Sequence, residues 1–78
     1  MATLQQGADQ HREAVDGFAA ALRQTPQNGA WWIGLGISLL AEGRTAGARE
    51  AFERARSTGT LSPDLLLYVE QRLRATTP

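Results

Sequence analysis

The reactive side chains of this 78-residue chain are few: one histidine, a handful of serines and eight arginines. His11 could bind a metal ion or act as a base, but the chain has no cysteine and no second histidine. A zinc site needs about four such ligands, and Ser38 and Ser62 have no histidine near them in the sequence to act as their base. We therefore interpret His11 as structural. We expect no catalytic residue, no metal site, no cofactor and no enzyme activity.

Two other patterns have a possible chemistry but are better explained by packing and solvation. Gly34-x-Gly36 lies in a helical segment with no preceding strand and no lysine, both of which a phosphate loop needs. We expect Gly36 to be the small residue at a helix crossing. The arginines of residues 44–56 alternate with Glu50 and Glu53, as on a solvated helix face. Because eight basic and eight acidic residues cancel, no net field attracts nucleic acid, and we expect no nucleic-acid partner.

Four helices are predicted to position these residues. Thirteen alanines and ten leucines, against four β-branched aliphatic residues, favour helix over sheet. Breaks at 25–29, 43–45 and 59–63 divide the chain into helices over 3–24, 29–42, 46–58 and 63–75, with Asn28, Thr45 and Ser62 as expected N-caps. The longest apolar run, residues 31–41, is shorter than the roughly 20 residues that span a bilayer. We expect no membrane insertion by this segment.

An internal repeat joins the first and third of these helices. The pattern Ala-x3-Phe-x2-Ala occurs first as Ala14, Phe18 and Ala21 and again as Ala48, Phe52 and Ala55. Each residue of the second copy follows its counterpart in the first by the same number of positions, and we call this distance along the sequence the repeat period. The segment Trp32-x2-Leu35-Gly36-x2-Leu39 precedes the second copy. This period and this pattern resemble tetratricopeptide repeat proteins. The resemblance implies an all-α fold, namely a short right-handed stack of about four antiparallel helices in one domain, 1–78.

Within that domain the resemblance covers one complete repeat at 29–62. The helix at 3–24 then corresponds to the second helix of a preceding repeat. Three positions depart from the family pattern: Leu39 replaces the common tyrosine, Thr60 stands in place of proline, and Glu70 stands where a helix contact wants glycine or alanine. Glu70 argues against a third full repeat and predicts a capping helix at 63–75.

The resemblance also implies a function. In the family, the positions held here by Ala30, Ile33, Ile37, Leu40 and Ala41 line a concave groove that receives partners. We predict a non-catalytic protein–protein interaction module, a scaffold with an apolar groove formed by Trp31, Ile33, Ile37 and Leu40 for a helix or extended peptide. Repeats that clamp a terminal carboxylate use Lys and Asn where Ile33 and Ile37 stand, so that activity is not carried over. The alternative left open is that the first or fourth helix covers these side chains.

A narrower similarity concerns residues 26–37, 61–65 and 68–73, which resemble the C-terminal end of bacterial MSHA-type pilus biogenesis proteins. That resemblance implies a role in a pilus or secretion assembly. It also implies a place on the periplasmic side of an inner-membrane protein. The sequence by itself leaves the compartment, cytoplasmic or periplasmic, and the partner open.

A second functional hypothesis is self-association. The helix at 3–24 corresponds to a second helix whose first helix is not part of this chain, so its apolar stripe has a free neighbour position. We predict a possible homodimer, through this face or by helix exchange, with Leu4, Val15, Phe18 and Leu22 at the interface. A short stack also gains stability from dimerisation.

Overall fold

The chain forms four α-helices connected by short loops in a computed structural model that describes the backbone of residues 2–76 and the side chains of residues 11–76. The helices are α1 (Ala2–Gln24), α2 (Gly29–Ala41), α3 (Thr45–Ser57) and α4 (Pro63–Thr76). No strand occurs between residues 2 and 76. The all-α fold class and the four helices predicted from the sequence are confirmed, and no helix boundary differs by more than one residue. None of the described helices is both long and apolar enough to cross a membrane.

The helix ends follow local chemistry. Asn28 caps α2 by accepting a hydrogen bond from Trp31 N–H at 3.2 Å, and Ser62 Oγ accepts one from Leu65 N–H at 3.4 Å in the first turn of α4. Gly43 ends the α2 segment with φ +77°, a left-handed conformation that glycine adopts without a steric penalty. The expected Thr45 cap was wrong. Arg44 holds the N-cap position of α3 without a side-chain cap, because the helix already includes Thr45.

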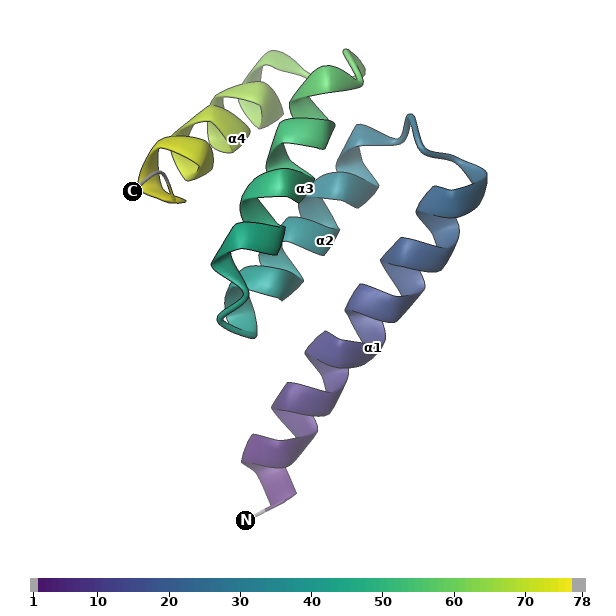
Figure 1. The fold of residues 1–78 in the computed structure, drawn as a ribbon, viewed down its shortest axis with the longest axis vertical. Helices are drawn as coiled ribbons and strands as arrows, with labels where there is room; N and C mark the ends of the chain where they lie inside the picture. The colour runs from purple at the N-terminus through teal and green to yellow at the C-terminus, as the bar shows by residue number, and fades with distance from the viewer. Residues whose placement is uncertain (1, 77–78) are drawn as a thin grey trace.

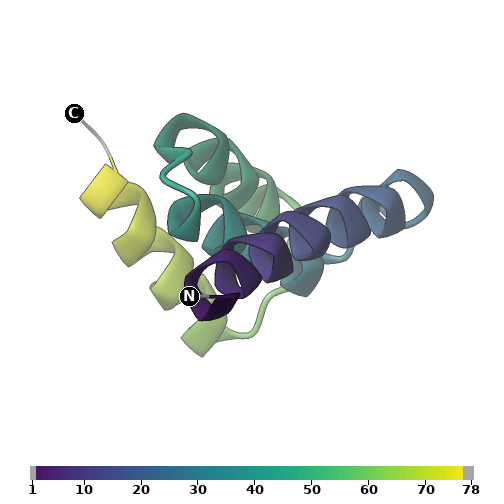
Figure 2. The ribbon, with the colours of Figure 1, turned by 90° about the horizontal axis from the view of Figure 1, so that it is seen from below.

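The helices stack in chain order, with α1 and α4 at opposite ends and α2 and α3 between them (Figures 1 and 2). Each helix packs mainly against its neighbours in sequence. The core lies where α2 and α3 meet, and it extends to both outer helices. Its buried apolar residues are Leu22, Ile33, Leu35, Leu39, Ala48, Ala51, Phe52, Ala55, Val69 and Leu73. The result is the short helical stack that the sequence predicted.

Two glycines of α2 let aromatic rings approach its backbone. A Cβ added at Gly36 would lie 2.8 Å from Cζ of Phe52 in α3, and one added at Gly34 would overlap the ring of Phe18 in α1. α2 therefore packs between the two phenylalanines of the internal repeat, with Phe18 on one side and Phe52 on the other. The predicted role of Gly36 as the small residue at a helix crossing is confirmed.

Candidate interaction surface

The four residues predicted to form a groove on α2 differ in exposure. Ile33 is only 7% exposed and belongs to the core, whereas Ile37, one helical turn later, is 44% exposed. Trp31 and Leu40 are half-buried and pack against the core. Ile37 is thus the member of the set that offers a large apolar surface to solvent. Whether these residues form a binding groove stays a prediction.

Exposed apolar side chains also occur on α4, where the sequence reasoning did not place any. Among residues 11–76, the large hydrophobic side chains that are exposed are Ile37, Leu65 and Leu67, the last 52% exposed. All three lie on α2 and α4, and none on α3 or the described part of α1. Leu67 stands one repeat period after Ile33, so this period was the signal that could have identified it. Leu67 on α4 therefore holds the same repeat position as Ile33 on α2, but its side chain is exposed whereas that of Ile33 is buried.

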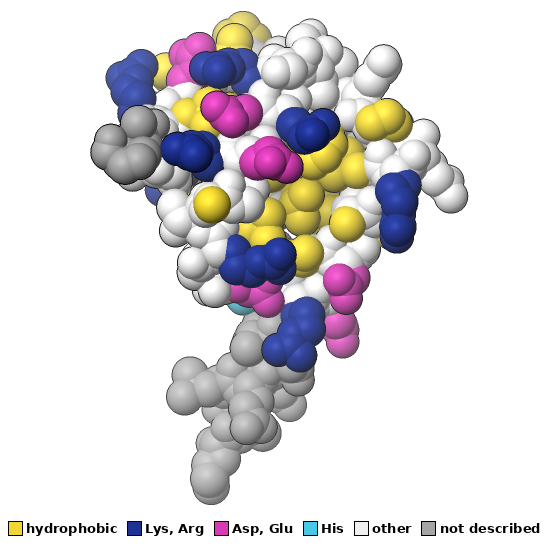
Figure 3. Space-filling view, in the orientation of Figure 1, with side chains coloured by type: hydrophobic (Ala, Val, Ile, Leu, Met, Phe, Trp, Pro, Cys, Tyr) yellow, Lys and Arg dark blue, Asp and Glu magenta, His cyan; other side chains and the backbone are white. Residues whose placement is uncertain are grey.

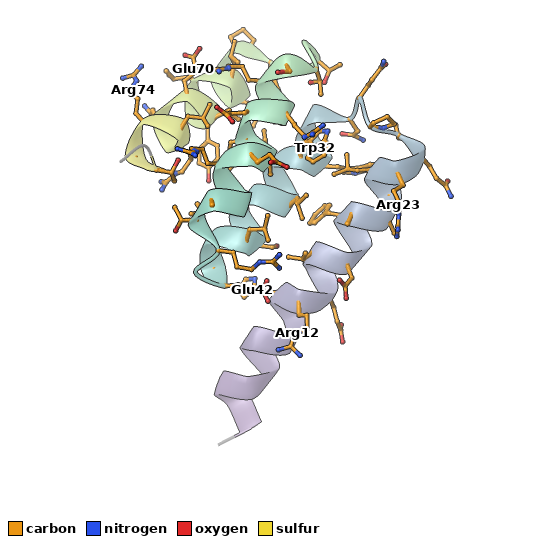
Figure 4. The ribbon with its side chains drawn as sticks, viewed as in Figure 1. Arg12, Arg23, Trp32, Glu42, Glu70 and Arg74 are labelled. Carbon is orange, nitrogen blue, oxygen red and sulfur yellow. The ribbon has the colours of Figure 1, made fainter. Side chains whose placement is uncertain are left out.

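Charged side chains border the α3–α4 side of the stack. A groove of about 550 Å³ between these helices is lined by Arg49, Glu53, Arg56, Glu70, Leu73 and Arg74. Glu70 and Arg74 lie on α4 at the edge of the stack opposite to Arg23 of α1 (Figure 4). Both signs are interspersed, which suits a solvated rim that orients a partner by charge. Among residues 11–76, no group of three or more potential metal-binding side chains occurs.

Trp32 is held in place by two polar contacts. Its Nε1–H donates a hydrogen bond of 2.8 Å to the carbonyl oxygen of Pro26, and the Arg54 guanidinium lies 5.5 Å from the centre of its ring. The indole lies between α3 and the C-terminal part of α1 (Figure 4). On the face shown in Figure 3, apolar side chains gather between α3 and α1, and charged side chains surround them. Through its hydrogen bond to Pro26, Trp32 therefore connects the α1–α2 loop to this apolar area.

The loop after α3 contains a polar contact that the sequence reasoning missed. Thr60 Oγ1 accepts a hydrogen bond of 3.2 Å from Gly29 N–H at the start of α2 and lies 3.3 Å from the carbonyl oxygen of Gln27. Thr58 Oγ1 lies 2.9 Å from the same hydroxyl. The threonine that replaces the family proline thus connects the ends of the 29–62 segment and fixes the start of α2.

The predicted self-association face on α1 is only partly free. Leu22 is buried, and Val15 and Phe18 are half-buried against the core. The side chain of Leu4 lies outside the described residues. Beside Phe18, a hollow of about 400 Å³ opens to solvent and is lined by Ala14, Gly17, Phe18, Ala21 and Trp31. The open part of α1 therefore lies next to the predicted stripe, on a side rich in small residues.

The comparisons with known proteins agree with the repeat pattern. A family model described as "Tetratricopeptide repeat" matches residues 1–64, which include α1, α2 and α3. No curated protein and no solved structure matches the chain.

Proposed function

The chain belongs to the tetratricopeptide repeat family, and we propose that it binds a protein partner along α2 and α4 through Ile37 and Leu67. Repeats of this family are protein–protein interaction modules and are typically non-catalytic. The observation that carries the proposal is the placement of the exposed large apolar side chains among residues 11–76, all of which lie on α2 and α4. Exposed apolar patches mark contact surfaces, and α2 and α4 both pack on α3.

The charged α3–α4 groove shares α4 with the proposed surface, through Glu70 and Arg74. Arg and Glu side chains alternate along the α3–α4 groove, and rim charges of this kind select the orientation of a partner more than they add affinity. An amphipathic helix with apolar side chains one turn apart, or an extended peptide with apolar side chains at alternate positions, fits Ile37 and its neighbours. The half-buried side chains of Trp31 and Leu40 would contact the partner at the edge of this surface. Ile33 is buried and would pack beneath the surface without touching the partner.

The test is partner capture with the intact chain immobilised in an extract of its own cells. Ile37→Asp and Leu67→Asp each place a charge on the proposed surface, and we expect both to lose the same captured protein. Ala46→Asp is the matched control, because it adds the same charge at an exposed position in the first turn of α3, where a carboxylate is favourable. Helix content must be unchanged in all three variants. Equal capture by the wild-type chain and by folded Ile37→Asp would contradict a partner surface that includes Ile37.

Two finer assignments remain proposals. A place in a pilus or secretion assembly is supported by the sequence resemblance of residues 26–37, 61–65 and 68–73 alone. The division of the chain into a complete repeat at 29–62, a preceding second helix and a capping helix is supported by the internal period and by the charged Glu70 on α4. Self-association is a second candidate function, and the hollow on α1 favours it.

A further inference from the structure

One side of α1 is open and built from small residues. The hollow of about 400 Å³ beside this helix is lined by Ala14, Gly17 and Ala21, with Phe18 and Trp31 as its large side chains. A Cβ added at Gly17 would meet nothing within 4 Å. Space for further side chains is therefore present at this position, although the rest of α1 packs on the core.

The internal repeat shows what covers the same positions elsewhere in the chain. One repeat period after the members of this face, α3 carries Ala48, Ala51, Phe52 and Ala55, which are at most 2% exposed. The Phe52 ring lies against Gly36 of α2 on one side and 6.2 Å from the Tyr68 ring of α4 on the other. Such a face is a helix-packing surface. On α1, Gly34 of α2 meets the Phe18 ring on one side, but no helix within residues 2–76 brings a small residue to the other side of this ring.

α4 of a second copy does not meet this requirement. Glu70 stands one repeat period after Gly36, so a long charged side chain occupies the position at which α2 presents glycine to a phenylalanine ring. Burying that carboxylate against Phe18 without a partner would be strongly unfavourable. The end-to-end stacking of copies, in which α4 of one would pack on α1 of the next, is therefore disfavoured.

α1 of a second copy can bring small residues to the Phe18 ring. Ala14, Gly17 and Ala21 follow each other at spacings of three and four, so they form one line along the helix. Arg12, Asp16 and Arg23 are exposed and lie on other sides of α1, which leaves this line without charge. The face carries both the small residues and the large ring, so it is complementary to itself.

We propose that two copies of this chain associate through the open face of α1, as an antiparallel pair around a twofold axis. The axis passes between Gly17 and Phe18, so that each Phe18 faces the partner's Gly17 and each Ala14 faces the partner's Ala21. A twofold contact uses the same patch on both copies, and small residues let the two helix backbones approach closely. The antiparallel arrangement also keeps Glu13, at the edge of the line, away from the partner's Glu13.

The first experiment is the solution mass of the intact chain over a concentration series. We expect the mass to rise from 8.4 kDa toward twice that value. Gly17→Glu has room in the single chain but buries a charge in the pair, so we expect dimer affinity to fall about 100-fold with helix content unchanged. Ala19→Glu is the control, because Ala19 is exposed on another side of α1. It should dimerise as the wild-type chain does.

Single cysteines test the orientation, since the chain has none of its own. An oxidised mixture of Ala14→Cys and Ala21→Cys chains should form the mixed disulfide dimer faster than either variant cross-links with itself. A faster 14–14 cross-link would show a parallel pair and overturn the proposed geometry.

A wild-type chain that keeps a mass of 8.4 kDa up to high micromolar concentration would overturn the proposal. The hollow would then belong to a helix of another protein. Dimers that persist in Gly17→Glu would place the contact on a different face, which also contradicts the proposal. Ile37→Asp should leave the mass unchanged, because Ile37 does not line the hollow on α1.

Discussion

Replacing Gly36 with alanine tests the closest helix contact in the core. The added Cβ would lie 2.8 Å from Cζ, 2.9 Å from Cε1 and 3.1 Å from Cδ1 of Phe52. Ordinary carbon contacts are about 3.5–4.0 Å, so the ring must move by about 0.5 Å or more. Phe52 is completely buried, and Tyr68 meets it edge-on at 74° on its other side, so there is no free space behind it.

The size of the effect follows from two opposing contributions. Overpacking a filled core costs about 1–3 kcal/mol, whereas alanine in place of a helical glycine returns about 1 kcal/mol. We expect Gly36→Ala to lower the free energy of unfolding by about 1 kcal/mol, which is a fall in Tm of about 4–8 °C for a domain of this size.

Gly47→Ala is the matched control for this measurement. Its Cβ would lie 3.5 Å from the nearest atom, Cδ1 of Leu39, which is an ordinary contact. It should therefore gain about 0.5–1 kcal/mol from helix propensity alone. Urea and thermal unfolding, followed by circular dichroism on all three chains, give the comparison. Equal stability of Gly36→Ala and Gly47→Ala would refute the close crossing of α2 and α3 at Phe52.

Two further substitutions test the contacts that hold the start of α2, both by urea unfolding. Thr60→Ala removes the acceptor of the Gly29 N–H and should cost about 1–2 kcal/mol, whereas Thr60→Ser keeps the hydroxyl and should cost less; equal losses would contradict the hydrogen-bond role. Trp32→Phe removes the indole donor to the Pro26 carbonyl and should cost about 1 kcal/mol. An unchanged midpoint in Trp32→Phe would mean that this hydrogen bond adds nothing to stability.

The fold was largely predictable because its signals are local or periodic. Asn28 and Ser62 cap helices through their own neighbours, and Gly43 ends a helix through its own backbone angle. The repeat pattern identified Phe52, and Gly36 was recognisable as the small residue at a helix crossing, whereas their contact is seen only in the structure. Such features depend on residues close in the chain or on a repeated pattern.

The exposure of the candidate site was harder to predict because it depends on where the stack ends. Ile33 and Leu67 hold equivalent positions in the repeat, but Ile33 is buried in the core and Leu67 lies on the outer helix. The pattern of a single helix cannot separate these two cases. Thr60 was missed for a related reason, since its hydrogen bond to Gly29 joins residues 31 positions apart.

The most direct test of the proposed partner site is photo-cross-linking in extracts of the source cells. A photoreactive phenylalanine analogue would replace Ile37, Leu67 or, as the control, Ala46 in the intact chain. We expect positions 37 and 67 to cross-link to the same protein, the one that Ile37→Asp fails to capture, and position 46 not to do so. Cross-linking to that protein from position 46 as efficiently as from position 37 would contradict a partner surface on α2 and α4.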